Sequence, residues 1–220
     1  MKTIRVTGRG QIKVKPDLTR IRITLEDTHA SYEETLSRSS ERSQALRTLL
    51  QFFDFAPSDL KTLNFQVNTE YESYQEDGVY KQRFRGYTYM HEMKIEFPID
   101  NERLGRILFA LSESEIKPVF QISYTVSNPE GAKNTVLAQA VSDAAKKARV
   151  LADAAGVPLG TIQSIDYSWD QVNLEVRPMM KMMAVGENST ADRAFALDIE
   201  PEDINLTDVV TVVWEIAQDD

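Results

Sequence analysis

The 220 residues of this chain are enough to bury a substantial hydrophobic core, in one large domain or in two small ones. A formal net charge of −9 repels the phosphate backbone of nucleic acids, so we expect no nucleic-acid partner. The sequence contains no cysteine, which excludes disulfides, thiolate metal ligands and cysteine nucleophiles.

Targeting and membrane segments are not visible in the sequence as given. No apolar run approaches the roughly 18 residues that span a bilayer, so we expect no membrane-spanning helix. The apolar stretch of a secretory signal does not follow Met1 and Lys2. These observations predict a cytoplasmic protein, although a periplasmic or envelope protein whose leader had been removed would have the same sequence.

The opening segment, TIRVTGRGQIKVKPDLTRIRITLED, alternates apolar and polar residues as β-strands do. We expect two short strands, at residues 4–6 and 12–14, joined by a tight turn or bulge at Gly8 and Gly10. A longer strand follows Pro16.

A helix of about six turns is predicted next from its apolar periodicity. Ser31 and Glu34 have the spacing of a capping box, and Pro57 ends the helix. One face combines apolar residues with two serines, which indicates close approach of the helix backbone to the element beneath it. The residues of this face are Tyr32, Leu36, Ser39, Ser43, Leu46, Leu50 and Phe53.

Residues 60–74 and 85–99 form two long alternating runs, and Asp77-Gly78 between them is a strong hairpin signal. Each run is about 14 residues long, which exceeds the usual strand length, so the distal half of the hairpin should protrude beyond the core. That half is aromatic and charged rather than aliphatic. We expect an interface with neighbouring subunits at its aromatic side chains, which are Tyr71, Tyr74, Tyr80 and Phe84.

The second half of the chain begins with a short predicted helix in DNERLGRILFALSES and a strand in PVFQISYTV. Asn128 and Pro129 then start a long helix that ends at Gly156. Its alanines should let the helix lie close to a sheet, whereas a coiled coil needs larger side chains. Asp143 and Lys147 form a favourable pair one turn apart. The predicted buried face consists of Leu137, Val141, Ala144, Ala148, Leu151 and Ala155.

Two strands complete the sequence, TIQSIDYSW and INLTDVVTVVWEI, with a predicted loop at residues 170–194 between them. The elements do not alternate regularly as strand, helix and strand. We therefore predict an α+β fold with a largely antiparallel sheet, on which two long helices and one short helix pack. We interpret residues 1–220 as a single domain, and two subdomains at about residues 1–100 and 101–220 are the alternative.

Catalytic and cofactor motifs are absent from the sequence. The Gly8-x-Gly10 pair lacks the third glycine and the following helix of a dinucleotide-binding loop. His91 does not begin a zinc-binding H-E-x-x-H motif, because Ile95 replaces the second histidine, so we interpret it as a hydrogen-bonded core or interface residue. No nucleophile elbow is present. We expect no enzyme activity, no catalytic residue and no cofactor, and an unrecognised hydrolase is a further alternative.

Four of the seven methionines lie close together in the polar segment RPMMKMMAVGENS. Thioether sulfur binds soft metals, above all Cu(I), so a copper site at these residues is one interpretation. Methionine also adapts well to interfaces, and we favour a flexible apolar contact with the core or a neighbouring subunit. The residues concerned are Met179, Met180, Met182 and Met183.

Taken in order, these segments resemble the SIMPL-domain family of bacterial periplasmic immunogenic and oxidative-stress-defence proteins and kinase-associated animal proteins. The resemblance rests on IRVTGRGQIKVKPDLTRIRITLE, DLKTLNFQVNTEYE, IDNERLGRILFAL and the closing VVTVVWEI. AVSDAAKKARVLADAAGVPLGTIQSI is its most recognisable segment. The matching segments extend over about 210 residues, nearly the whole chain.

The resemblance implies a protein without established enzymatic activity, so it provides no catalytic residues. It also implies a homo-oligomer, since some members form ring-like or channel-like assemblies. We expect a non-enzymatic, self-assembling interaction or scaffold protein with a role in stress response, whose protein partner the sequence does not identify. The alternative is a stress protein that binds a small molecule or Cu(I) through its methionine-rich loop.

Overall fold

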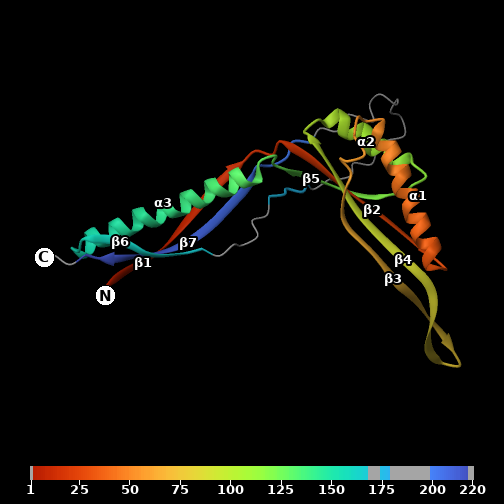
Figure 1. The fold of residues 1–220 in the computed structure, drawn as a ribbon, viewed down its shortest axis with the longest axis horizontal. Helices are drawn as coiled ribbons and strands as arrows, with labels where there is room; N and C mark the ends of the chain where they lie inside the picture. Colours follow the sequence, from red (N-terminus) through yellow and green to blue (C-terminus); the bar gives the residue numbers. More distant parts are fainter. Residues whose placement is uncertain (1, 168–173, 179–198, 218–220) are drawn as a thin grey trace. The chain divides into compact units, whose positions relative to one another are not determined.

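A computed structural model of the chain describes residues 2–167, 174–178 and 199–217 (Figure 1). The described part contains helices and antiparallel strands in the order β1-β2-α1-β3-β4-α2-β5-α3-β6-β7, which confirms the predicted α+β class. The strands form two separate sheets rather than one.

The chain divides into two compact units whose segments interleave along the sequence. Unit 1 comprises residues 1–17, 125–176 and 201–220, and unit 2 comprises residues 18–124 and 177–200. These bounds differ from a division near residue 100. The amino-terminal strand belongs to unit 1 because it pairs with the last strand of the chain.

Unit 1 is a three-stranded sheet with one long helix on one face (Figure 1). The sheet order is β1 (Thr3–Val14), β7 (Ile204–Ile216) and β6 (Leu159–Asp166), and both pairings are antiparallel. Helix α3 (Pro129–Ala155) lies along β1 and β7.

The structure contradicts the expected turn at the two amino-terminal glycines, because β1 continues through both of them. Gly8 pairs with Val210, and its missing side chain makes room for the backbone of α3. A Cβ atom on Gly8 would lie 2.0 Å from the carbonyl oxygen of Ala140, and one on Gly10 would lie 2.0 Å from that of Val136. The glycines therefore permit close contact between helix and strand, which explains their spacing.

The alanine-rich helix does cover a sheet, but the predicted face was partly wrong. Leu151 is 50% exposed, and Ala155 is exposed as well. The glycines admit only small side chains at the closest approach, so the helix turns its alanines toward β1 and its larger residues to the flanks. The buried residues of α3 are Val136, Ala140, Ala144, Ala148 and Ala152.

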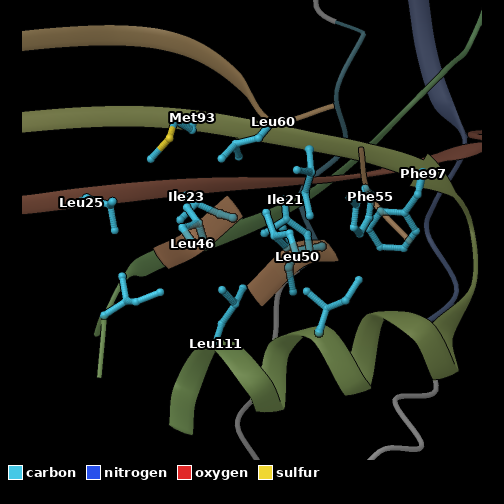
Figure 2. Packing of buried hydrophobic residues seen from close by; sticks show 14 of the residues in the cluster. Ile21, Ile23, Leu25, Leu46, Leu50, Phe55, Leu60, Met93, Phe97 and Leu111 are labelled. Carbon is cyan, nitrogen blue, oxygen red and sulfur yellow. The ribbon is translucent and has the colours of Figure 1, made fainter. Parts of the chain in front are cut away.

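Unit 2 is a four-stranded sheet in the order β3-β4-β2-β5, with two helices packed against its core. The strands are β2 (Leu18–His29), β3 (Lys61–Glu76), β4 (Val79–Pro98) and β5 (Val119–Thr125). The helices are α1 (Tyr32–Gln51) and α2 (Asn101–Glu113). Figure 2 shows the core between them, in which Ile23 of β2, Leu50 of α1 and Leu111 of α2 meet.

Local capping signals in the sequence set the helix starts. The side chain of Ser31 accepts a hydrogen bond from the amide of Glu34 at 3.2 Å, as the predicted capping box requires. Asn128 accepts one from the amide of Gly131 at 2.8 Å. Gly156 ends α3 in the left-handed conformation, with a φ of 65°, which favours glycine.

Candidate functional site

The candidate site is the outer part of the β3–β4 hairpin, residues 70–86, which we call the distal ribbon. Strand β2 pairs with β4 from Tyr87 to Pro98, so among the described strands β4 has β3 as its single partner along the distal ribbon. The hairpin extends past β2 and α1 (Figure 1). This arrangement confirms the expected protrusion.

The tip and the base of the distal ribbon are both set by local geometry. Asp77 and Gly78 have φ values of 51° and 79°, the two positive angles that a tight two-residue hairpin turn needs. At the base, a Cβ atom on Gly86 would lie 2.2 Å from the carbonyl oxygen of His29. Glycine at this position lets the end of β2 pass close to β4.

Aromatic side chains form a continuous row at the base of the distal ribbon, and all of them except half-buried Tyr87 are exposed. Tyr71 meets Phe84 with 5.8 Å between ring centroids, and Phe84 meets Tyr87 at 5.2 Å. Tyr87 in turn meets Tyr32 of α1 at 5.7 Å. Tyr71 is 54% exposed and Phe84 is 47% exposed. Large, rigid aromatic surface that stays in water is typical of protein interfaces.

The exposure of the aromatic residues corrects the predicted buried face of α1. Tyr32 and Leu36 were assigned to the buried face of α1 but are 52% and 37% exposed. Tyr32 lies at the helix start, where its ring meets that of Tyr87. Tyr80 is 78% exposed near the tip, and half-buried Tyr74 packs under the guanidinium of Arg83. The apolar periodicity of α1 alone could not separate Tyr32 from the core.

Charged side chains on the distal ribbon pair with each other across the strands. Arg83 forms an ion pair with Glu72, and Lys81 forms one with Glu76 at 2.6 Å. Such exposed pairs contribute little to stability, typically about 0.2–1 kcal/mol. They offset part of the charge around the aromatic row.

His91 is a satisfied core histidine, which confirms the interpretation made from its strand position. Its Nδ1 lies 3.0 Å from the hydroxyl of Ser43, and its Nε2 lies 2.9 Å from the hydroxyl of Thr62. The ring of Phe65 meets it edge-on at 5.1 Å. Burial lowers the pKa of His91, and the nearby charge of Arg47 lowers it further. The imidazole therefore stays neutral and structural.

The described residues contain no candidate metal site and no candidate membrane-spanning helix. No group of three or more histidine, aspartate or glutamate side chains among residues 2–167, 174–178 and 199–217 could hold a metal ion. Over the same residues, no helix is both long enough and apolar enough to traverse a bilayer. The predicted methionine contacts fall outside the described residues and stay a prediction, as does most of the predicted loop that contains them: Met179, Met180, Met182 and Met183.

Comparison with known proteins agrees with the sequence motifs. A model of the SIMPL family, described as a protein of unknown function (DUF541), matches residues 4–214. The uncharacterized protein YggE of Edwardsiella ictaluri (strain 93-146) is 25% identical over 183 residues, which make up 80% of this chain and 74% of that protein. The uncharacterized protein YggE of Escherichia coli (strain K12) is 22% identical over 210 residues, 96% of this chain and 81% of that protein. The chain therefore belongs to the SIMPL family.

Proposed function

We propose that this protein is a non-enzymatic scaffold that self-associates through its distal ribbon. The observation that supports this proposal is the aromatic row, in which exposed Tyr71 and Phe84 continue to half-buried Tyr87. Aromatic residues are enriched where protein surfaces associate, and their contact energy is large because each buries much apolar area. A second copy that covers the row would remove this area from water.

The backbone of the distal ribbon supports the same proposal. Strand β3 is an edge of its sheet, and β4 has no second neighbouring strand from Val79 to Gly86 among the described strands. A two-stranded ribbon is only marginally stable in water by itself. Contact with another subunit would stabilise the ribbon and pair its open edges, which otherwise invite non-specific association.

The oligomeric state of the purified full chain tests this proposal. Light scattering after size exclusion should give a mass well above the 25.0 kDa monomer at micromolar concentration. Phe84→Glu should shift the protein to the monomer, because a carboxylate would be desolvated inside the contact. Its unfolding temperature should change little, since Phe84 lies outside the core of unit 2.

Phe52→Glu is the matched control. Phe52 is 83% exposed and follows the last residue of the 20-residue helix α1, about 30 Å from Tyr32 at the other end of the helix. The Phe52→Glu variant introduces the same charge at an exposed aromatic residue and should leave the mass of the assembly unchanged. A monomeric wild-type protein, or equal effects of both variants, would contradict assembly through the distal ribbon.

Copper binding by the methionine-rich segment is the alternative function, and the clustering of four methionines within five positions favours it. Anaerobic calorimetry with Cu(I) separates the two. Saturable binding that is lost when Met179, Met180, Met182 and Met183 are replaced by leucine would support the copper function. Absence of Cu(I) binding would exclude the copper function and would leave the test of assembly unaffected.

A further inference from the structure

The outer edge of β1 in unit 1 presents unpaired main-chain groups. Strand β1 is a terminal strand of its sheet, and β7 is its single strand partner among the described residues. Its even-numbered residues hydrogen-bond inward, as the bond from the amide of Ile216 to the carbonyl of Lys2 shows. In an antiparallel pair the alternate residues then direct both backbone groups outward. Arg5 and Thr7 are such residues.

An ion pair on α3 closes one part of this edge. Asp143 and Lys147 lie 2.7 Å apart. The carboxylate of Asp143 accepts a hydrogen bond from the amide of Arg9 at 2.8 Å, and the ammonium of Lys147 donates one to the carbonyl of Thr7 at 3.2 Å. The two side chains occupy the places that a neighbouring strand would take. The edge therefore stays open on the amino-terminal side of Thr7 and is blocked at the Thr7 carbonyl and the Arg9 amide.

An apolar groove lies beside the open part of the edge. Its volume is about 400 Å³, and it is lined by Val6 of β1 together with Lys146, Lys147, Val150 and Leu151 of α3. Val150 is 66% exposed and Leu151 is 50% exposed. Lys146 has no ion-pair partner among the described residues. Open backbone groups, apolar walls and a positive charge thus meet at one place.

We infer that this edge and groove bind an extended peptide segment of a partner protein, which adds to β1 as a further strand. Peptide addition to a sheet edge supplies main-chain hydrogen bonds, while pockets for alternate side chains select the sequence. The groove fits an apolar side chain, and Lys146 selects an acidic residue near it. Because Asp143 and Lys147 block the edge, the added strand is short, about five residues at the usual spacing along a strand.

Charge argues against a second copy of β1 as the occupant. The residues of β1 whose side chains lie on the open face of the sheet include Arg5 and Arg9. Symmetric antiparallel pairing of two copies within the open part would centre on Arg5 and place the Arg5 side chains of both copies against each other, and like charges across a strand pair are destabilising. An extended segment whose acidic residue lies beside Lys146 avoids this repulsion and meets complementary charge in the groove. This binding surface lies in unit 1 and does not depend on assembly through the distal ribbon of unit 2.

The experiment selects phage-displayed random peptides on the purified full chain and then measures Kd for the synthetic, fluorescently labelled winners. Arg5→Pro removes the outward amide, which an edge strand tolerates because that amide faces away from the sheet. Arg5→Gln keeps the amide and loses only the exposed ion pair with Asp166. Leu151→Glu places a negative charge in the groove, and Phe52→Glu is its control outside unit 1.

The selected peptides should contain an apolar residue close to an acidic one. Arg5→Pro and Leu151→Glu should each weaken binding by about tenfold or more, while both controls stay close to wild type. Bound peptide should slow hydrogen exchange at the amides of Arg5 and Thr7. No enrichment, selection of basic peptides, or equal binding by all variants would overturn the inference. An oligomer that Arg5→Pro dissolves would assign the edge to a second copy instead.

Discussion

Replacement of Gly8 by alanine tests how closely the helix and the strand of unit 1 approach each other. The added Cβ atom would lie 2.0 Å from the carbonyl oxygen of Ala140, 2.5 Å from the amide nitrogen of Ala144 and 2.7 Å from its Cβ. Ordinary contact begins at 3.4 Å, so the first of these distances is about 1.4 Å too short. Two of the three atoms are backbone atoms of a helix, which no side-chain rotation can move away.

The cost follows from the movement that α3 has to make. A helix moves as a rigid body, so the contacts of Ala140, Ala144 and Ala148 with the sheet all loosen together. A gap of 0.5–1 Å forfeits roughly a quarter to a half of each contact energy. Overpacking of a core costs about 1–3 kcal/mol, and a backbone clash belongs at the upper end of that range. We expect a loss of about 3 kcal/mol and a fall in Tm of roughly 6–12 °C.

Urea unfolding followed by tryptophan fluorescence measures this loss. Trp214 is 5% exposed and packs in the same cluster as Ala144, so its emission reports on unit 1. Trp169→Phe removes the other tryptophan of the chain. Gly156→Ala is the control, because its Cβ atom would meet nothing within 4 Å and only the left-handed φ is disfavoured, at about 1 kcal/mol. If Gly8→Ala were no less stable than Gly156→Ala, the close approach would be refuted.

Two further predictions concern the core of unit 2. Because the pKa of His91 is lowered by burial and by Arg47, the unfolded state binds more protons than the folded state. The contribution of neutral His91 to the free energy of unfolding should therefore be complete above pH 6.5, the unfolded pKa, and should be lost as the pH falls below that value. The free energy of unfolding should then depend less steeply on pH between pH 7 and 5 in His91→Gln than in the wild type, and equal slopes would contradict this. Arg42 donates to the hydroxyl of buried Tyr89 at 2.8 Å, so Arg42→Ala should cost about 1–3 kcal/mol in urea unfolding. Arg38→Ala, which loses only an exposed pair, should cost less than about 0.5 kcal/mol, and similar losses for both variants would argue against this hydrogen bond.

Features that depend on a few neighbouring residues were predictable. Ser31 and Asn128 cap helices where their spacing indicates, and the turn of the long hairpin lies at Asp77 and Gly78. His91 lies in the core because its strand alternates apolar and polar residues. Each signal acts through hydrogen bonds or backbone angles within four residues, or through the alternation of one strand, so no knowledge of the fold is needed to read it.

Features that depend on distant contacts were missed or misread. Gly8 and Gly10 were interpreted as a turn, since the helix that needs their missing side chains lies more than a hundred residues later in the chain. The pair of Asp143 and Lys147 was recognised as helix-stabilising, but its bonds to the edge of β1 join residues 134 and 140 positions apart. Leu151 was wrongly placed in the core, because the buried face of α3 is set by contact with the distant glycines of β1.

The residues by themselves determined the fold class, the helix and strand types, the long hairpin and the family. Only the tertiary structure decided which face of α3 is buried, how the chain divides into two interleaved units and which edges stay open. The physical reason is the range of the interactions. Caps and turns are satisfied locally, whereas burial and edge pairing depend on which distant segment arrives beside a residue.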